Sequence, residues 1–220
     1  MLTLPARHFW DADYLKQHAP EFIVADTRPD APAHHVLWAG DQGEVGWLLH
    51  GYQSAWLPKK LLQADQQASL VDALFASSRH WGIALHFNKG LAGAPEEEIA
   101  AARGTATNPQ VLEAFALAIS ASEGPPAYLG IPGSAPDLAA ARDEAAKIDA
   151  AVGELRRIVP DAGAYVSESN YFQPDWQAAF WGSNYPKLAA VKERYDPSGL
   201  FYVWHGVGSK AWNADGFTRL

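Results

Sequence analysis

An amphipathic stretch over residues 137–159 is the sequence feature that most constrains the fold. Its apolar side chains recur at the spacing of one helix face, its charged side chains lie mostly away from that face, and Pro160 ends the pattern. A helix of this kind is stabilised mainly by packing its apolar face on another layer, so the chain has to supply that layer. The apolar face consists of Leu138, Ala141, Ala145, Ile148, Val152 and Leu155.

Strand patterns earlier in the chain supply the second layer. Residues 22–25 and 81–87 have the composition of strands. Residues 36–40 and 44–52 predict an antiparallel hairpin, with Asp41-Gln42-Gly43 as its tight turn.

Helical patterns separate these strands. One helix is expected after Pro58 and another from Pro95, which is followed by an acidic first turn. The composition of residues 111–120 favours a helix, but the run is short enough for a strand, and residues 123–136 predict a surface loop. Hairpin signals without strict strand–helix alternation predict an α+β fold, with an antiparallel β-sheet covered by helices. The helix after Pro58 has a predicted buried stripe of Leu61, Leu62, Leu70, Val71, Leu74 and Phe75.

Composition excludes several classes of function. The chain has 25 acidic and 17 basic residues and no basic run, which argues against nucleic acid or an anionic membrane as partner. No apolar run approaches the ~18 residues of a membrane-spanning helix, and nothing at the N-terminus resembles a signal peptide, so the cytoplasm is the expected location. Because there is no cysteine, thiolate metal sites and a cysteine nucleophile are excluded.

The stretch Ala164–Gly208 combines several local signals. Pro174 and Asp175 predict the start of a short helix, and residues 182–186 break it and begin a second one. Asp196-Pro197-Ser198-Gly199 then predicts a turn, followed by an apolar strand over residues 200–204. Spacing alone predicts a well-packed C-terminal segment, but it does not account for the order of the residues.

That order follows the motif G-x-N-Y-x-x-L-x-x-V-K-x-x-Y-D-P-x-x-x-F, which resembles the C-terminal segment of berberine-bridge-enzyme-like FAD-linked oxidases of the vanillyl-alcohol-oxidase superfamily. The resemblance implies a substrate-binding (cap) domain over residues 1–160 and a berberine-bridge-like C-terminal segment over residues 161–220. The family's glycine-rich N-terminal FAD-binding domain is absent from this sequence, so FAD would be supplied by a missing domain or a partner chain. The motif residues are Gly182, Asn184, Tyr185, Leu188, Val191, Lys192, Tyr195, Asp196, Pro197 and Phe201.

The resemblance also implies site residues in this segment. The family places the word Tyr-x-Asn-x-x-Asp against the flavin, and the matching residues here are Tyr165, Ser167 and Asn170. Tyr165 is therefore a candidate catalytic base and Tyr171 a second, while Ser167, Asn170 and Asn184 are candidate cofactor contacts. A catalytic phenol needs its pKa of ~10 lowered by positive charge or by hydrogen bonds to the phenolate. A packed ring with a satisfied hydroxyl is the structural alternative for either tyrosine.

A second group of candidates lies at the end of the strand 81–87. His86 and Asn88 share one face by two-residue alternation. The family lays such strands over the flavin, which makes His86 a candidate base or hydrogen-bond donor. Asn88 and Lys89 become candidate substrate contacts, and Lys89 could also acidify Tyr165. The alternative is a strand end that meets solvent.

The chain is rich in aromatic residues, with nine Trp, eight Tyr and nine Phe, which suits either a dense core or a cavity lined by rings. Core packing is the alternative for each tryptophan. The candidates for lining are Trp38, Trp47, Trp56, Trp204 and His205, with Trp204 as the substrate contact.

Two other motifs carry weaker signals. Gly130-Ile131-Pro132-Gly133-Ser134 could face a phosphate, and His34-His35 could contribute to a metal site, but an ordinary loop and a solvated pair are favoured. No dinucleotide-binding, Walker, H-E-x-x-H or G-x-S-x-G motif is present.

These observations leave three hypotheses of function. The first is the substrate-binding and C-terminal part of an FAD-dependent oxidoreductase, which oxidises an alcohol, sugar or related C–H donor by hydride transfer to flavin and is not expected to act alone. The second is a flavin-free module that binds a small molecule, or an inactive fragment. The third is a structural role in a complex. A flavin-facing surface without its partner would expose apolar side chains, which predicts association with an FAD-binding domain or subunit, or a homo-oligomer.

Overall fold

The computed structural model describes residues 6–8, 11–32, 34–41, 46–213 and 215–220. The chain divides into two compact units, which are treated separately below. Unit 1 consists of Met1–Leu48 and Glu123–Asp137, and unit 2 of Leu49–Ser122 and Leu138–Leu220.

Unit 1 is built around a two-stranded antiparallel sheet. Strand β1 (Ile23–Ala25) pairs with β2 (Val36–Trp38), with Ile23 opposite Trp38. The predicted hairpin between residues 36–40 and 44–52 is therefore wrong, because β2 pairs with the preceding strand β1 and not with β3. Residues 42–45, which include part of the predicted turn, lie outside the described residues. The other elements of unit 1 are η1 (Ala6–His8), α1 (Ala12–His18), η2 (Pro20–Phe22) and η3 (Ala39–Asp41).

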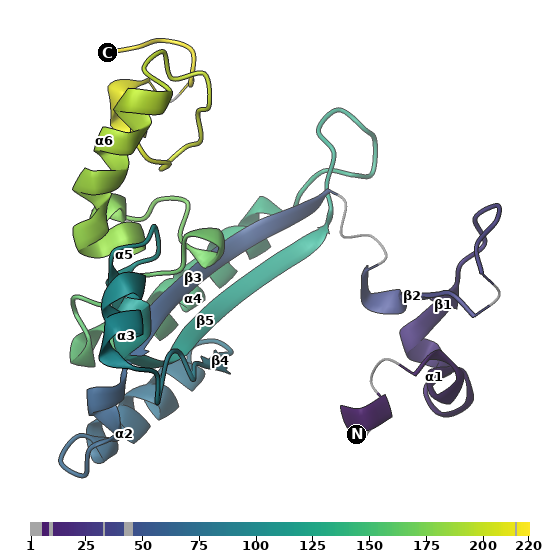
Figure 1. Ribbon diagram of the computed structural model, residues 1–220. Helices are drawn as coiled ribbons and strands as arrows, with labels where there is room; N and C mark the ends of the chain where they lie inside the picture. Colours follow the sequence, from purple (N-terminus) through teal and green to yellow (C-terminus); the bar gives the residue numbers. More distant parts are fainter. Residues whose placement is uncertain (1–5, 9–10, 33, 42–45, 214) are drawn as a thin grey trace. The chain divides into compact units, whose positions relative to one another are not determined.

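Unit 2 contains a three-stranded antiparallel sheet in the order β3-β5-β4 (Figure 1). Its strands are β3 (Trp47–Pro58), β4 (Ala84–Phe87) and β5 (Ala114–Pro126). Residues 111–120, which composition left open, thus form a short 3-10 helix, η5 (Pro109–Glu113), followed by strand. The strand runs four residues, 123–126, into the predicted loop, since β5 ends at Pro126.

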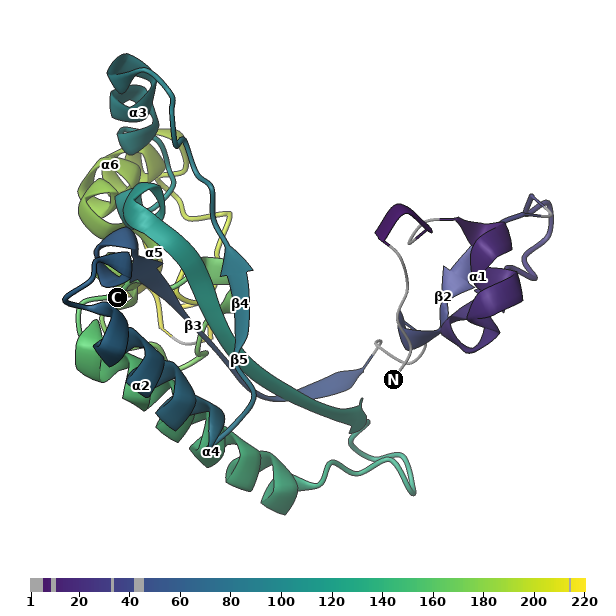
Figure 2. The same cartoon turned by 90° about the horizontal axis from the view of Figure 1, so that it is seen from below.

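Two helices, α2 (Gln67–Ser78) and α4 (Leu138–Ile158), pack on one face of this sheet (Figure 2). The long helix predicted from residues 137–159 is confirmed, and Ile148, Val152 and Leu155 are buried as expected. A hydrogen bond of 2.6 Å from the Ser77 hydroxyl to the Ala151 carbonyl joins the two helices. The core between helices and sheet contains Ala55, Leu57, Leu61, Leu70, Ala73, Ala118, Leu155, Val159 and Ala162.

The predicted stripe after Pro58 is correct only in part. The chain first forms a 3-10 turn, η4 (Lys59–Leu62), so the phase of the following α2 differs from that of one continuous helix. As a result Leu61 and Leu70 are buried, whereas Val71 and Phe75 are 62% and 61% exposed. The predicted helix with an acidic first turn is confirmed as α3 (Glu96–Arg103).

The regular elements of the C-terminal segment are helices and 3-10 turns. It contains η6 (Val166–Glu168), α5 (Trp176–Trp181), η7 (Gly182–Asn184), α6 (Tyr185–Tyr195) and η8 (Ser209–Ala211) (Figure 1). The strand predicted over residues 200–204 is wrong, because this run is irregular and Leu200, Phe201 and Val203 are exposed. The α+β class with an antiparallel sheet is confirmed. No helix among the described residues is long and apolar enough to cross a bilayer.

Candidate active site

The C-terminal segment brings four rings into one stack. His205 lies between two indoles, with ring centroids 5.3 Å from Trp176 and 4.8 Å from Trp204. The Trp204 ring in turn stacks on Tyr171 at 5.9 Å, and its Nε1 donates to the Tyr171 carbonyl at 3.3 Å. Trp176 is buried, whereas Tyr171 is 64% exposed, so the stack runs from the interior of the segment to its surface.

A turn stabilised by Asp196 lies just before Trp204 and His205 in the chain. The Asp196 carboxylate accepts hydrogen bonds from the Leu200 and Phe201 amides at 2.8 and 3.1 Å, and it pairs with Lys192 one helical turn earlier. The hydrogen bond from Lys192 lowers the pKa of Asp196, and the two backbone amides lower it further. Desolvation of the carboxylate opposes them by raising the pKa. The motif residues Lys192, Asp196 and Phe201 thus fix how the chain leaves α6.

The electrostatic character of His205 follows from its place between the indoles. Burial lowers the pKa of its imidazole, because the charged form is disfavoured away from water. The ring is therefore mainly neutral at neutral pH, when one nitrogen can accept a proton and the other donate one. Its backbone is left-handed, with φ of 57°.

A buried amide joins the segment to the rest of unit 2. The Asn184 side chain donates to the carbonyls of Arg103, Thr105 and Thr107 at 2.9, 2.8 and 3.0 Å. Asn184 is only 9% exposed, so both of its N–H groups are committed to the backbone between α3 and η5. This predicted cofactor contact therefore has an evident positioning role.

The other candidates of the segment line its surface. Tyr165 is 43% exposed, and its backbone N–H donates to the buried Ser54 hydroxyl at 3.0 Å. Ser167 is exposed in η6, and the Asn170 side-chain oxygen accepts from the Phe172 amide at 2.9 Å. Among the described residues, the hydroxyls of Tyr165 and Tyr171 form no hydrogen bond, so both phenols are open to a substrate or partner.

The candidates at the end of β4 do not join this stack through any contact between described residues. His86 is exposed on β4, opposite Leu117 of β5. The Asn88 amide caps the strand end, donating to the Val111 carbonyl at 2.7 Å while its oxygen accepts from the Gly90 amide. Lys89 is exposed, and no ion pair or hydrogen bond between described residues connects it to Tyr165.

Sequence reasoning missed one member of the stack and undervalued another. Trp176 was not singled out, and His205 was considered only as part of a pocket wall. Their position beside the motif was the available signal, but stacking depends on how the chain folds after α6. The other predicted rings lie elsewhere, with Trp38 stacked on Phe22 in unit 1. No group of three or more metal-ligating side chains was found among the described residues.

Comparison with known proteins agrees with the C-terminal motif. Residues 164–208 match the family model described as "Berberine and berberine like". An uncharacterized FAD-linked oxidoreductase of Arthroderma benhamiae is 49% identical over 65 residues, which are 30% of this chain and 11% of that protein. The VAO-type flavoprotein oxidase VAO615 of Thermothelomyces thermophilus is 43% identical over 61 residues, 28% of this chain and 11% of that protein.

Solved structures extend the similarity beyond the motif. The VAO-type flavoprotein MtVAO615 of Myceliophthora thermophila C1 superposes with a TM-score of 0.54 at 25% identity, covering 74% of this chain and 28% of that one. MtVAO713 of the same organism has the same TM-score at 20% identity, with coverage of 73% and 27%, and shows the fold alone. This chain thus spans less than a third of the relatives that it matches. Its residues 164–208 are similar to the berberine-like C-terminal segment of VAO-type, FAD-linked oxidoreductases.

Proposed function

We propose that this chain is the substrate-binding and C-terminal part of an FAD-dependent oxidoreductase that oxidises an alcohol, a sugar or a related C–H donor. The observation that carries the proposal is the row of exposed rings in the berberine-like segment. Tyr171, Phe172 and Trp204 are 64%, 80% and 38% exposed, although aromatic side chains of this size are usually covered. Such a surface suits contact with a flavin-binding domain or partner chain.

The side chains around this surface fit one end of FAD. Tyr171, Phe172 and Trp204 offer rings, and Ser167 and Asn170 offer hydrogen-bonding groups, as the planar flavin ring requires. The pyrophosphate requires a different site, a cradle of backbone N–H groups. In the glycine-rich turn Gly130–Ser134, the Ile131 and Ser134 amides already donate to the Tyr128 and Ile131 carbonyls. We therefore assign the remainder of the FAD site to a domain or subunit outside this chain.

FAD, when bound, supplies the acceptor for a hydride. The residues of this chain would bind the substrate and handle its proton. Tyr165 or Tyr171 would accept the proton of the substrate hydroxyl, and His86 is a further candidate for that step. Asn88, Lys89 and Trp204 would contact substrate, and Asn184 would act by holding the C-terminal segment in place.

The experiment is coexpression of this chain with a cognate FAD-binding domain, followed by a visible absorption spectrum of the purified complex. Flavin bands near ~450 nm that require both components are expected. Anaerobic addition of substrate should bleach them, and Tyr165→Phe or Tyr171→Phe should slow the bleaching at least about 100-fold, as loss of a general base does. Tyr195→Phe, which changes an exposed tyrosine of α6, is the matched control. A colourless preparation under both conditions would refute the proposal.

A flavin-free module that binds a small molecule is the second candidate function. The observation that favours it is a cavity of about 540 Å³ beside β3, which lies within the usual size of ligand sites.

A further inference from the structure

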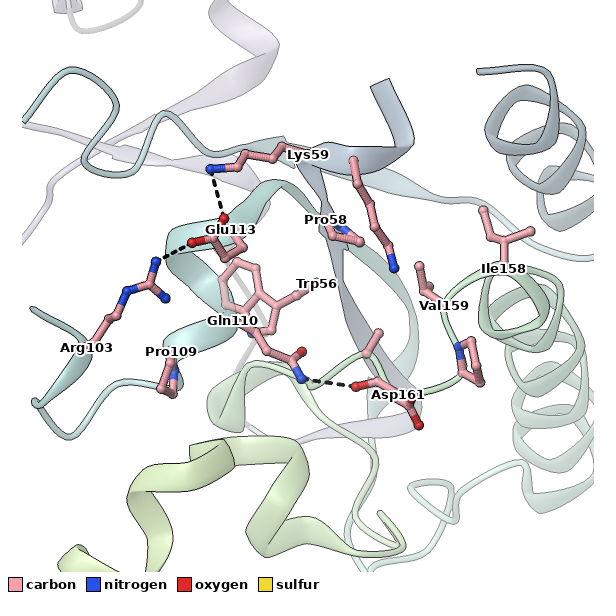
Figure 3. Close-up of a pocket in the computed structure, with 13 residues that line it drawn as sticks. Trp56, Pro58, Lys59, Arg103, Pro109, Gln110, Glu113, Ile158, Val159 and Asp161 are labelled. Carbon is pink, nitrogen blue, oxygen red and sulfur yellow. Dashed lines mark hydrogen bonds and ion pairs between the residues drawn. The ribbon is translucent and has the colours of Figure 1, made fainter. Parts of the chain in front are cut away.

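The cavity of unit 2 lies where β3 ends and η4 begins, against η5 and the last turn of α4 (Figure 3). Its volume of about 540 Å³ is enough for a ligand with one or two rings. Its apolar wall includes Trp56, Pro58, Pro109 and Ile158. None of the nine catalytic, cofactor or substrate residues proposed above lines it, so the cavity has no part in the oxidoreductase chemistry. Trp56, which the sequence offers as a ring for a cavity wall, does line it.

The wall around Trp56 is held in place by the backbone. The Trp56 amide donates to the Gly163 carbonyl at 3.0 Å. The Gln110 side chain bridges the same segment, because its oxygen accepts from the Gly163 amide at 2.6 Å and its nitrogen donates to the Asp161 carbonyl at 3.1 Å. The indole is thus mounted on a fixed strand end and faces a preformed space.

Positive charge predominates in the lining. Lys59 and Arg103 both pair with the single carboxylate of Glu113, with 2.8 Å between the Lys59 ammonium and the carboxylate. These two hydrogen-bonded cations lower the pKa of Glu113, so it stays ionised. Lys60 forms no ion pair with any described residue. Three cations against the carboxylates of Glu113 and Asp161 leave a net charge of +1, in a chain whose net charge is −8.

The indole nitrogen of Trp56 lacks a partner. Among the buried side-chain nitrogen and oxygen atoms of the described residues, this nitrogen is the one without a hydrogen-bond partner. A buried donor without an acceptor costs free energy, and a ligand that brings an acceptor removes that cost. The atom is covered in the free protein, so a ligand acceptor reaches it only if the indole moves.

We propose that this cavity binds a small aromatic carboxylate, with its ring against Trp56 and the neighbouring prolines and its carboxylate among Lys59, Lys60 and Arg103. The apolar wall selects the ring, and the surplus positive charge selects the anion. This site requires no flavin, so it stands or falls independently of the oxidoreductase function. It deepens the second candidate function, the flavin-free module, which rests on the same cavity.

The test is a titration of the ¹⁵N-labelled chain with benzoate, followed through the indole N–H resonances of the tryptophans. The indole N–H resonances of Trp56 and Trp204 are assigned by their loss from the spectra of Trp56→Phe and Trp204→Phe. A saturable shift of the Trp56 resonance is expected, together with weaker binding by about tenfold in Lys60→Gln, as loss of one charge-assisted hydrogen bond predicts. Lys210→Gln removes the same charge from an exposed position outside the cavity and should leave the affinity unchanged.

Benzyl alcohol, which keeps the ring and lacks the charge, should cause little shift. Equal responses to benzyl alcohol and benzoate would overturn the selection for an anion. A benzoate response at Trp204 instead of Trp56 would place the ligand at the aromatic stack and overturn the site itself, as would the absence of any saturable shift. Each of these results is obtained without flavin. A response at Trp204 would concern the substrate surface of the oxidoreductase proposal, whereas the other outcomes concern the cavity alone.

Discussion

Replacement of Asn184 by alanine tests whether its amide positions the berberine-like segment. The two N–H groups of this side chain serve three backbone carbonyls, those of Arg103, Thr105 and Thr107. One intramolecular hydrogen bond contributes about 0.5–1.5 kcal/mol net, so loss of both donors should reduce the local free energy of unfolding by about 2 kcal/mol. Since 1.4 kcal/mol corresponds to a factor of ten, this is a roughly 30-fold change in the opening equilibrium.

Native-state hydrogen exchange measures that change directly. The amides of Gly104 and Thr105, which donate to Ala101 and Ala102 at the end of α3, should exchange about 30-fold faster in Asn184→Ala. Asn184→Asp keeps the shape but places a carboxylate against the carbonyls, so the acceleration should be larger. Ser183→Ala, at the exposed neighbouring position, should change exchange less than about twofold.

Unchanged exchange in Asn184→Ala would refute the positioning role. If flavin were also lost from the coexpressed complex while exchange stayed the same, a direct contact between Asn184 and the cofactor would be the better explanation. If exchange accelerated and flavin were lost together, the cofactor site would depend on the anchor.

Three further predictions concern the core and the pH response. Leu155→Ala, at a fully buried position between α4 and the sheet, should lower the free energy of unfolding measured with urea by about 2–5 kcal/mol, whereas Leu62→Ala, at a position 47% exposed, should cost far less. Burial lowers the pKa of His205 below its ordinary 6.5, so the unfolded chain binds more protons than the folded chain and stability should fall as the pH drops below 6.5. Thermal melts between pH 7.5 and 5 should show this fall in melting temperature, and His205→Asn should remove it. Hydrogen bonds from Ser122 and His50 lower the pKa of Glu144, so its contribution to the free energy of unfolding is present above its unfolded pKa near 4.5 and lost on acidification. Glu144→Gln should reduce the pH dependence of acid unfolding monitored by circular dichroism, and Glu97→Gln should not.

Local signals were sufficient for the elements that depend on neighbouring residues. The long apolar stripe predicts α4, and the acidic turn after Pro95 predicts α3, because helix periodicity and capping act within a few residues. Strand pairing was beyond the same reasoning. β3 pairs with β5, about sixty residues later in the chain, and β2 pairs with β1 instead of its other neighbour. Composition cannot distinguish between such partners.

Exposure was the second limit. Leu200, Phe201 and Val203 are as apolar as the core residues of β5, yet they lie at the surface. An apolar run indicates that a segment avoids water, but not whether the chain itself or another molecule covers it. The same limit applies to the candidate site, where the motif located Tyr171 and Trp204 but the stack with His205 and Trp176 depends on the irregular path after α6.

The left-handed backbone at His205 restricts which residues can occupy that position. Apart from glycine, the residues enriched at such φ values are asparagine, aspartate and histidine. Histidine alone among them has an aromatic ring, so it satisfies both the turn and the stack between Trp176 and Trp204. Saturation mutagenesis at this codon should therefore yield variants that keep either the turn or the stack, and engineering of the surrounding surface should begin at other positions.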